Sequence, residues 1–448
     1  MALAVGTRHD ASLGDDYFVA PPLAGLVIYQ VHLDPSLAVD ELAAILDTIA
    51  TLGVTAIELL PASGLAEAQE RYVPAHIALE RAFGGAATLQ NLIAEAHHRG
   101  LAVIVNIAYQ GLAPMANMVL DINRDSVRRV IVREAVRWLR DTHVDGIRHD
   151  MGAYADLVDA SSVARAAGWR LIRDMNAAIR AEHSHVVLIA LDDRGDTRVT
   201  SMDASGALFH AQWDMQFVHT VGEALHGHGP MSDVRDAIGS SFGDTFSRVI
   251  YARCAELIGR EPAPEEAPLD WESVKRVTLG VSMVLTSPGI PLLFQGQEVV
   301  HGGQVGDSPN HPQGGFPELV RDLVRLRRNW DDTTRGLSGH GLDVFHCNEV
   351  SRVAAWHRWA DIGPGDDVIV VANLSGNSYP AYRLGFPDDG LWRLRFSSDD
   401  ASYSSLFGGQ PSHDVTAQFR PVDAQPASAE VPIPPYSLLV FSQDRWPV

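Results

Sequence analysis

The sequence is poor in cysteine and contains no long hydrophobic run. Its 448 residues include two cysteines, Cys254 and Cys347, which are too few for a disulfide framework and lack the spacing of a metal site. No stretch approaches the roughly 20 apolar residues of a membrane span, and the first residues have no apolar run of signal-peptide length. These absences predict a cytoplasmic protein. The 19 histidines are scattered without ligand spacing, so we expect no metal and no other cofactor.

Positive charge is also scarce. The 35 lysines and arginines face 56 acidic residues, which gives a net charge of -21. Binding to a polyanion draws its affinity from basic side chains that replace condensed counterions. We therefore expect neither nucleic acid nor an anionic membrane as a partner, whereas a neutral ligand such as a sugar is compatible with an acidic surface. The oligomeric state stays open.

Short apolar runs rich in β-branched residues alternate with helical patterns over the first three quarters of the chain. Eight such runs begin at Leu26, Ala56, Ala102, Asp145, Val186, Ala207, Ser247 and Ile290. Repeated strand–helix units of this kind predict an α/β fold with a parallel sheet. Their number favours a (β/α)8 TIM barrel, and an open doubly wound sheet is the alternative.

The pattern changes after a helix that is expected to end near Arg328. From there on, short alternating runs are separated by Gly, Pro, Asp and Ser, without a long helical period. We expect a small antiparallel β-sandwich at the C-terminus. The predicted organisation is an N-terminal extension (1–20), a barrel domain (21–335) with a very short insertion after its third strand, and an all-β domain (339–448).

One motif lies at the end of the fourth predicted strand. The segment VDGIRHD, residues 144–150, places Arg148 and Asp150 two positions apart. Because side chains alternate along a strand, both residues project from the same face at its C-terminal end, where barrels hold their active sites. The motif resembles the D-G-x-R-x-D motif of the α-amylase superfamily, glycoside hydrolase family 13.

Other segments resemble landmarks of this family in the same order, from about Ala24 to Gln443. They are VIYQVHLD, RYVPAHIALERAFGG, GLAVIVNIAYQG, LDIN and TSPGIPLLFQGQE. WDMQFVHT is similar to glucan-branching enzymes, and LIALDDRGDTR is similar to maltooligosyltrehalose trehalohydrolases. The resemblance implies an α-glucan or oligosaccharide as substrate or ligand. It also implies that Tyr72 stacks under the sugar.

Retaining glycosyl transfer needs two carboxyl groups, one as nucleophile and one as acid/base. The resemblance assigns the nucleophile to Asp150 and its guanidinium partner to Arg148. The acid/base Glu of the family, however, aligns with Leu191, which cannot transfer a proton. The His-Asp pair of the family aligns with Ala255 and Glu256, so Glu256 is a candidate for a relocated acid.

Further positions differ from the family in the third-strand motif. Asn106, Gln110 and Gly111 stand where the family has Asp, Asn and His. His210 and Trp213 are candidates for lining the sugar site, although packing roles are at least as plausible for both.

Three functions remain open at this point. The first is a branching-enzyme-like protein that binds or acts on α-glucans or oligosaccharides by retaining glycosyl transfer or hydrolysis. The second is a catalytically inactive glucan-binding or regulatory protein, because the acid/base Glu is missing. The third is a repurposed enzyme that takes an activated glycosyl donor, in which Asp150 acts with Glu256, Asp192 or Asp193.

Overall fold

The computed structural model describes most of the chain. The described residues are 18–33, 39–61, 83–107, 124–151, 162–192, 194–253, 257, 270–298, 315–361, 363 and 365–444. Tyr72, Glu256 and Asp193 lie outside this part, and so does the short insertion predicted after the third strand.

Eight parallel strands form a closed barrel in sequence order. They are β1 (Ile28–Leu33), β2 (Ala56–Pro61), β3 (Ala102–Ile107), β4 (Gly146–Asp150), β5 (Val187–Leu191), β6 (Ala211–Trp213), β7 (Arg248–Ile250) and β8 (Ile290–Phe294). Each of the eight predicted runs begins at, or up to four residues before, the start of one of these strands. The barrel is confirmed and the open sheet is not observed. Strands buried on both faces need nearly continuous apolar sequence, which is why these runs were recognisable.

Amphipathic helices connect the strands. They are α1 (Val39–Thr51), α3 (Ala86–His97), α4 (Asp125–Thr142), α6 (Ser162–Glu182), α7 (Met215–Leu225), α8 (Met231–Gly239), α10 (Trp271–Thr286) and α11 (Phe316–Arg327). Helices α7 and α8 were not among the elements predicted from the sequence. The start of α7 is marked by Asp214, whose carboxylate accepts a hydrogen bond from the Phe217 N–H at 3.0 Å. None of the described helices is both long and apolar enough to span a bilayer.

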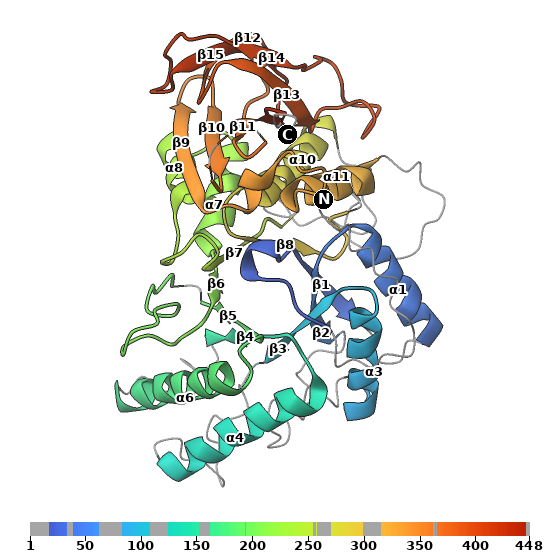
Figure 1. Cartoon of the computed structure of the whole chain (residues 1–448), viewed down its shortest axis with the longest axis vertical. Helices are drawn as coiled ribbons and strands as arrows, with labels where there is room; N and C mark the ends of the chain where they lie inside the picture. Colours follow the sequence, from blue (N-terminus) through green and yellow to red (C-terminus); the bar gives the residue numbers. More distant parts are fainter. Residues whose placement is uncertain are drawn as a thin grey trace. The chain divides into compact units, whose positions relative to one another are not determined.

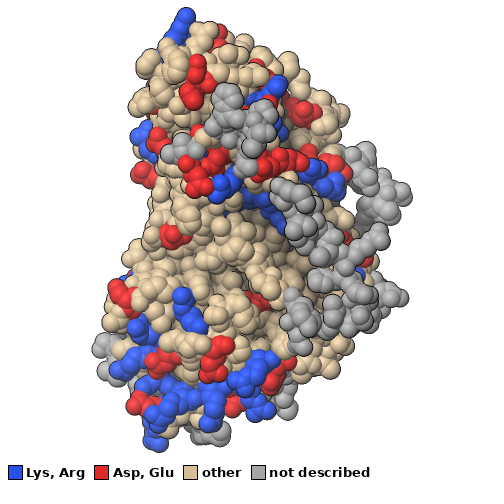
Figure 2. Space-filling model, viewed as in Figure 1, with Lys and Arg blue, Asp and Glu red and all other residues tan. Residues whose placement is uncertain are grey.

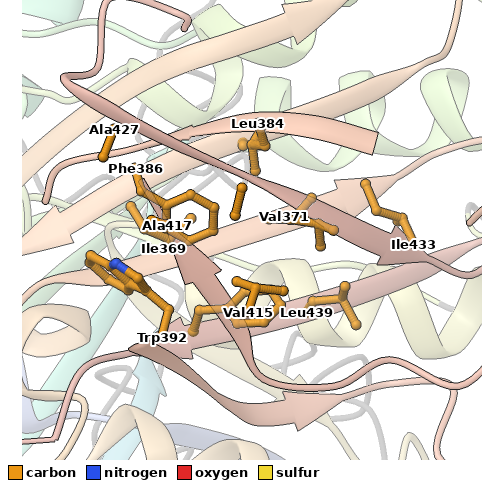
Figure 3. Close-up of a cluster of buried hydrophobic side chains, with 14 of the residues drawn as sticks. Ile369, Val371, Leu384, Phe386, Trp392, Val415, Ala417, Ala427, Ile433 and Leu439 are labelled. Carbon is orange, nitrogen blue, oxygen red and sulfur yellow. The ribbon is translucent and has the colours of Figure 1, made fainter. Parts of the chain in front are cut away.

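The C-terminal strands form two antiparallel sheets. The six-stranded sheet has the order β14-β13-β16-β11-β10-β9, and β12 pairs with β15. Their bounds are β9 (Gly341–Asn348), β10 (Val353–Trp359), β11 (Val368–Asn373), β12 (Tyr379–Phe386), β13 (Gly390–Ser397), β14 (Val415–Ala417), β15 (Ala427–Ile433) and β16 (Ser437–Ser442). Side chains from both sheets, among them Leu384, Trp392 and Leu439, form one buried cluster (Figure 3). The predicted β-sandwich is therefore confirmed.

The chain divides into two compact units that differ from the predicted domains. Unit 1 comprises Met1–Pro22, Val31–Asp192 and Ser201–His210, and unit 2 comprises Leu23–Gln30, Asp193–Thr200 and Ala211–Val448. Strands β2 to β5 belong to unit 1, and strands β6 to β16 belong to unit 2 (Figure 1). The predicted boundaries at 21–335 and 339–448 remain a prediction.

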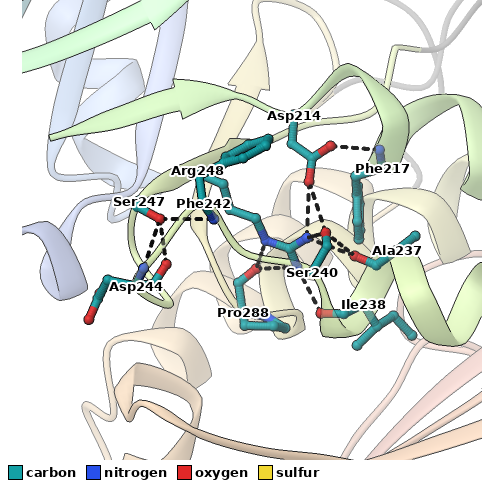
Figure 4. A network of polar contacts seen from close by, with 10 residues as sticks. All are labelled: Asp214, Phe217, Ala237, Ile238, Ser240, Phe242, Asp244, Ser247, Arg248 and Pro288. Carbon is teal, nitrogen blue, oxygen red and sulfur yellow. Dashed lines mark hydrogen bonds and ion pairs between the residues drawn. The ribbon is translucent and has the colours of Figure 1, made fainter. Parts of the chain in front are cut away.

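Unit 2 buries a guanidinium at the start of β7. Arg248 has no exposed surface and donates hydrogen bonds to the Asp214 carboxylate, to Ser240 and to three backbone carbonyls (Figure 4). Two of those carbonyls, Ala237 O and Ile238 O, lie at the C-terminal end of α8, where the helix dipole favours a cation.

Two more buried arginines hold the turn that leads into β8. Arg327 donates to Ser287 O and Gly289 O, and Arg358 donates to Thr286 O. Burial and, second, the charge of Arg248 lower the pKa of Arg327 to about 9. The start of β8 is thus fixed by side chains from distant parts of the chain.

Candidate functional site

Strand β4 carries the predicted nucleophile at its last residue. Asp150 is half-buried, and in the parallel register its partner on β5 is Leu191. Registered partners on parallel strands project to the same face, and neighbouring strands lie ~4.8 Å apart. The residue beside Asp150 on the β5 side is therefore Leu191, at the position where the sequence analysis located the missing acid/base.

Arg148 is buried and forms an ion pair with a residue that the sequence analysis missed. Its Nε lies 2.6 Å from Glu58 Oε1, and the two side chains are 5% and 0% exposed. Glu58 on β2 is paired with Ile104 on β3, and Ile104 is paired with Gly146 on β4, so Glu58 lies at the level of Gly146. Glu58 thus lies four residues, or roughly 13 Å along the strand, below Asp150.

This ion pair provides charge compensation that a buried guanidinium requires. A signal for Glu58 was present in the sequence, because a carboxylate inside the apolar run AIELLP needs a partner when it is buried. Asn106 is the registered neighbour of Arg148 on β3, so it projects to the same face.

Asp192 follows β5 directly and is 1% exposed, in contrast to the half-buried Leu191. Because side chains alternate along a strand, a residue directly after Leu191 projects to the face opposite that of Leu191 and Asp150. A leucine cannot donate or accept a proton, so the β5 side of Asp150 offers no acid/base.

Two histidines of unit 1 have lowered pKa values. His149 has no exposed surface and contacts the Phe209 ring edge-on, and burial lowers its pKa to about 3. His210 accepts a hydrogen bond from Leu188 N at Nδ1, and its Nε2 lies 2.6 Å from Arg180 Nη1 on α6. Burial, and then the charge of Arg180, lower the pKa of His210 to about 4.

Both ring nitrogens of His210 therefore contact groups of the protein's own β5 and α6. Such contacts are those of a packing residue. The sugar-binding role of His210 remains a prediction, and the structure supplies a structural role for the same side chain.

Unit 2 groups three aromatic rings at the C-terminal ends of β6, β7 and β8. The ring centroids of Trp213 and Tyr251 are 4.7 Å apart, those of Tyr251 and Phe294 5.5 Å, and those of Trp213 and Phe294 6.2 Å. Barrel enzymes bind ligands at this end of the strands, and aromatic rings supply apolar surface there. Trp213 was a candidate from the sequence and Tyr251 and Phe294 were not, although these two lie inside the predicted runs that begin at Ser247 and Ile290.

A second missed pair joins β1 and the end of β8 within unit 2. The Tyr29 hydroxyl donates to Glu298 Oε1 at 2.8 Å, and the Gly296 N–H donates to Glu298 Oε2 at 3.0 Å. Burial raises the pKa of the Glu298 carboxyl, which favours its protonated form relative to an exposed glutamate.

Within the described residues, no group of three or more His, Cys, Asp or Glu side chains is arranged to hold a metal ion. Positive charge is distributed unevenly, however. Arginines gather over α4 and α6 of unit 1 (Figure 2). Several of them are paired with acids, such as Arg137 with Asp141 at 3.5 Å and Arg140 with Glu182 at 3.3 Å. Such pairs are typical of a solvated, salt-bridged helix face.

Comparisons with known proteins find similarity to α-amylases and glucan-branching enzymes. Residues 345–444 match the family described as "Alpha amylase, C-terminal all-beta domain". The chain is 25% identical to the 1,4-alpha-glucan branching enzyme of Thermobifida fusca over 92% of this chain and 63% of that protein. It is 28% identical to the branching enzyme of Cupriavidus necator over 73% of this chain and 47% of that protein. The chain thus spans about three-fifths or less of the length of these curated relatives.

Solved structures share the fold. An Anoxybacillus α-amylase superposes with a TM-score of 0.66 at 13% identity, covering 95% of this chain and 100% of the other. The α-amylase of Geobacillus thermoleovorans, solved with acarbose, gives 0.65 at 14% identity, covering 94% and 98%. At these identities the likeness concerns the fold alone.

Proposed function

Because the chain belongs to the α-amylase superfamily, glycoside hydrolase family 13, and resembles its branching enzymes, we propose that it recognises α-glucans or related oligosaccharides at the C-terminal ends of the barrel strands. Asp150, Arg148 and Tyr72 form the central sugar subsite, and Trp213 and His210 are further candidate sugar-binding residues. The chemistry assigned to Asp150 is nucleophilic attack in a retaining glycosyl transfer or hydrolysis.

The proposal includes a barrel domain over 21–335 and an all-β domain over 339–448, in a cytoplasmic protein. The observation that supports the proposed chemistry is the strand register, which pairs Asp150 with Leu191. It supports a subsite that retains the nucleophile and lacks the acid/base at the usual place.

An activated donor such as α-glucosyl fluoride isolates the role of the nucleophile. The Asp150 carboxylate attacks the anomeric carbon, the carbon–fluorine bond breaks, and fluoride leaves with the bonding electrons without needing a proton. In retaining enzymes the residue that protonates the leaving group later deprotonates the attacking water. Its absence therefore slows the second step as well, and we expect a covalent glucosyl-protein to accumulate.

The test is fluoride release together with the intact mass of the protein. Wild type should release a burst of fluoride and gain the mass of one glucosyl group, and Asp150→Asn should do neither. Asp174→Asn, which changes an exposed acid on α6, is the matched control and should behave as wild type. Wild-type release no greater than that of Asp150→Asn would contradict the assigned role of Asp150.

A gain-of-function variant tests the missing acid directly. Leu191→Glu adds a carboxyl on the strand beside Asp150, and the ~4.8 Å spacing of strands is compatible with the roughly 5–5.5 Å between the two carboxyls of retaining enzymes. We expect hydrolysis of an unactivated maltooligosaccharide to rise by roughly 10²–10⁴-fold, as general acid catalysis supplies. Leu191→Gln, which has the same shape without the acid, should show no gain. Equal rates for the Glu and Gln variants would contradict the idea that a missing acid limits the reaction.

The second candidate function is a catalytically inactive glucan-binding or regulatory protein, and Leu191 beside Asp150 favours it. Its signature is maltooligosaccharide binding without turnover of either substrate. The repurposed enzyme, in which Asp150 acts with Glu256, Asp192 or Asp193, has another signature. It would turn over fluoride or aryl glycosides continuously and leave glucans unchanged.

A further inference from the structure

Unit 2 exposes a small aromatic surface where α10 begins. Trp271 is 38% exposed and Leu406 is 50% exposed, and Tyr436 beside them is half-buried. The ring centroids of Trp271 and Tyr436 are 6.3 Å apart, with their planes at 62°. Single exposed apolar side chains are common, so the exposure itself does not indicate a site.

The two rings are held in place by hydrogen bonds. The indole Nε1 of Trp271 donates to Leu406 O at 3.1 Å, and the Tyr436 hydroxyl donates to Glu272 Oε1 at 2.9 Å. The backbone N–H of Tyr436 donates to Ser375 O at 2.9 Å. Rings fixed in this way lose little conformational entropy when a ligand binds.

The backbone of Tyr436 adopts an unusual conformation. Its φ of 42° lies in the left-handed region, which a bulky aromatic residue rarely occupies. Such conformations persist where the surrounding structure imposes them, and they concentrate at functional sites.

One ion pair lies beside the rings. Glu272 and Arg276 form an ion pair, and the Arg276 guanidinium lies 5.5 Å from the centre of the Tyr436 ring. The carboxylate supplies hydrogen-bond acceptors and the guanidinium supplies donors, while their charges cancel. A neutral ligand rich in hydroxyl groups fits this combination better than an anion or a cation does.

We propose that Trp271, Leu406 and Tyr436 form a second carbohydrate-binding surface, separate from the residues assigned to the subsite of Asp150. The apolar face of a glucosyl unit stacks on the Trp271 indole, and its hydroxyls bond with Glu272 and Arg276. The choice of a neutral α-glucan as the ligand rests on the function proposed above.

Electrophoresis in native gels that contain soluble starch tests this surface, because binding retards the protein. We expect wild type and Asp150→Asn to be retarded. Trp271→Ala should lose most of the retardation, with a rise in Kd of roughly tenfold from the lost stacking. The matched control is Trp330→Ala. Trp330 is also 50% exposed, but Arg325 and Arg328 lie against its ring, so its removal should leave Kd unchanged.

Retardation of Trp271→Ala equal to that of wild type would overturn the second surface. Wild type that is not retarded by starch would overturn it too, whereas Asp150-dependent fluoride release in the same preparation would leave the proposed function standing. If Trp271→Ala lowers the melting temperature, Glu272→Gln decides the matter. This substitution of an exposed side chain keeps both rings and removes one charged acceptor. We therefore expect the Kd for starch to rise by about threefold. An unchanged Kd for Glu272→Gln would then reject the proposal.

Discussion

Replacement of Arg248 by methionine should destabilise unit 2 severely. The guanidinium has no exposed surface and lies 3.0 Å from Asp214 Oδ2 and 2.6 Å from Ser240 Oγ. Methionine fills similar apolar space but donates no hydrogen bond. In the variant the Asp214 carboxylate, which is 3% exposed, loses its positively charged partner and keeps the hydrogen bond from the Phe217 N–H.

The magnitude follows from these contacts. Breaking a buried ion pair by removing one partner costs about 3–5 kcal/mol. Loss of donors to Ala237 O, Ile238 O and Pro288 O increases that cost, while the removal of repulsion between Arg248 and Arg327 offsets part of it. We therefore expect a loss of about 4 kcal/mol in the free energy of unfolding.

Urea unfolding at neutral pH, followed by circular dichroism, measures this loss. Arg383→Met is the matched control, because Arg383 forms an exposed ion pair with Glu430 at 2.8 Å whose removal should cost less than about 1 kcal/mol. Adding Asp214→Asn to Arg248→Met should restore part of the stability, since the stranded charge is removed. A loss for Arg248→Met no larger than that of the control would refute the reasoning.

Three further predictions follow from buried side chains. The pKa of His149 falls from 6.5 to about 3 on folding, so its contribution to the free energy of unfolding is complete above pH 6.5 and decreases as the pH falls toward 3. At pH 5 this free energy is lower by about 2 kcal/mol. Urea unfolding at pH 8 and pH 5 should show that the stability of His149→Leu depends less on pH than that of wild type. Lys275 is the single lysine of the sequence, is fully buried and pairs with Asp399 at 2.5 Å. An amine-reactive ester should therefore leave it unmodified in the native protein and label it in urea, as peptide mass spectrometry would detect; native labelling would contradict its burial. Trp392→Ala empties a fully buried position of the sandwich core and should cost about 3–5 kcal/mol in chemical unfolding, and a loss below about 1 kcal/mol would be inconsistent with this packing.

The interior of the site was predictable only in part. The pairing of Asp150 with Leu191 agrees with the alignment of motifs, because strand periodicity and the order of the strands constrain which residues are neighbours. The partner of Arg148 was not predictable in this way. Glu58 lies 90 residues earlier in the chain, and only the closing of the barrel brings the two charges together. The catalytic and sugar-binding roles of these residues remain predictions that the fluoride experiment addresses.

The sequence by itself determined the class of the fold. Nearly continuous apolar runs such as those of β3 and β5 are typical of strands buried on both faces, and the short runs after Arg328, separated by turn residues without a long helical period, are typical of an antiparallel β-domain. These are local signals, carried by residues close together in the chain. Strand β14 and helices α7 and α8 were not predicted from the sequence, because few residues carry the periodic pattern of each element.

The tertiary structure alone decided which polar groups meet in the interior. Arg248, Arg327 and Arg358 come from β7, α11 and β10, and together they hold the carbonyls of the turn before β8. The periodicity of the sequence does not predict such contacts, because a guanidinium and its acceptors are close in space and distant along the chain. Burial is the physical reason for them, since a buried charge or carbonyl must find a partner wherever the fold supplies one.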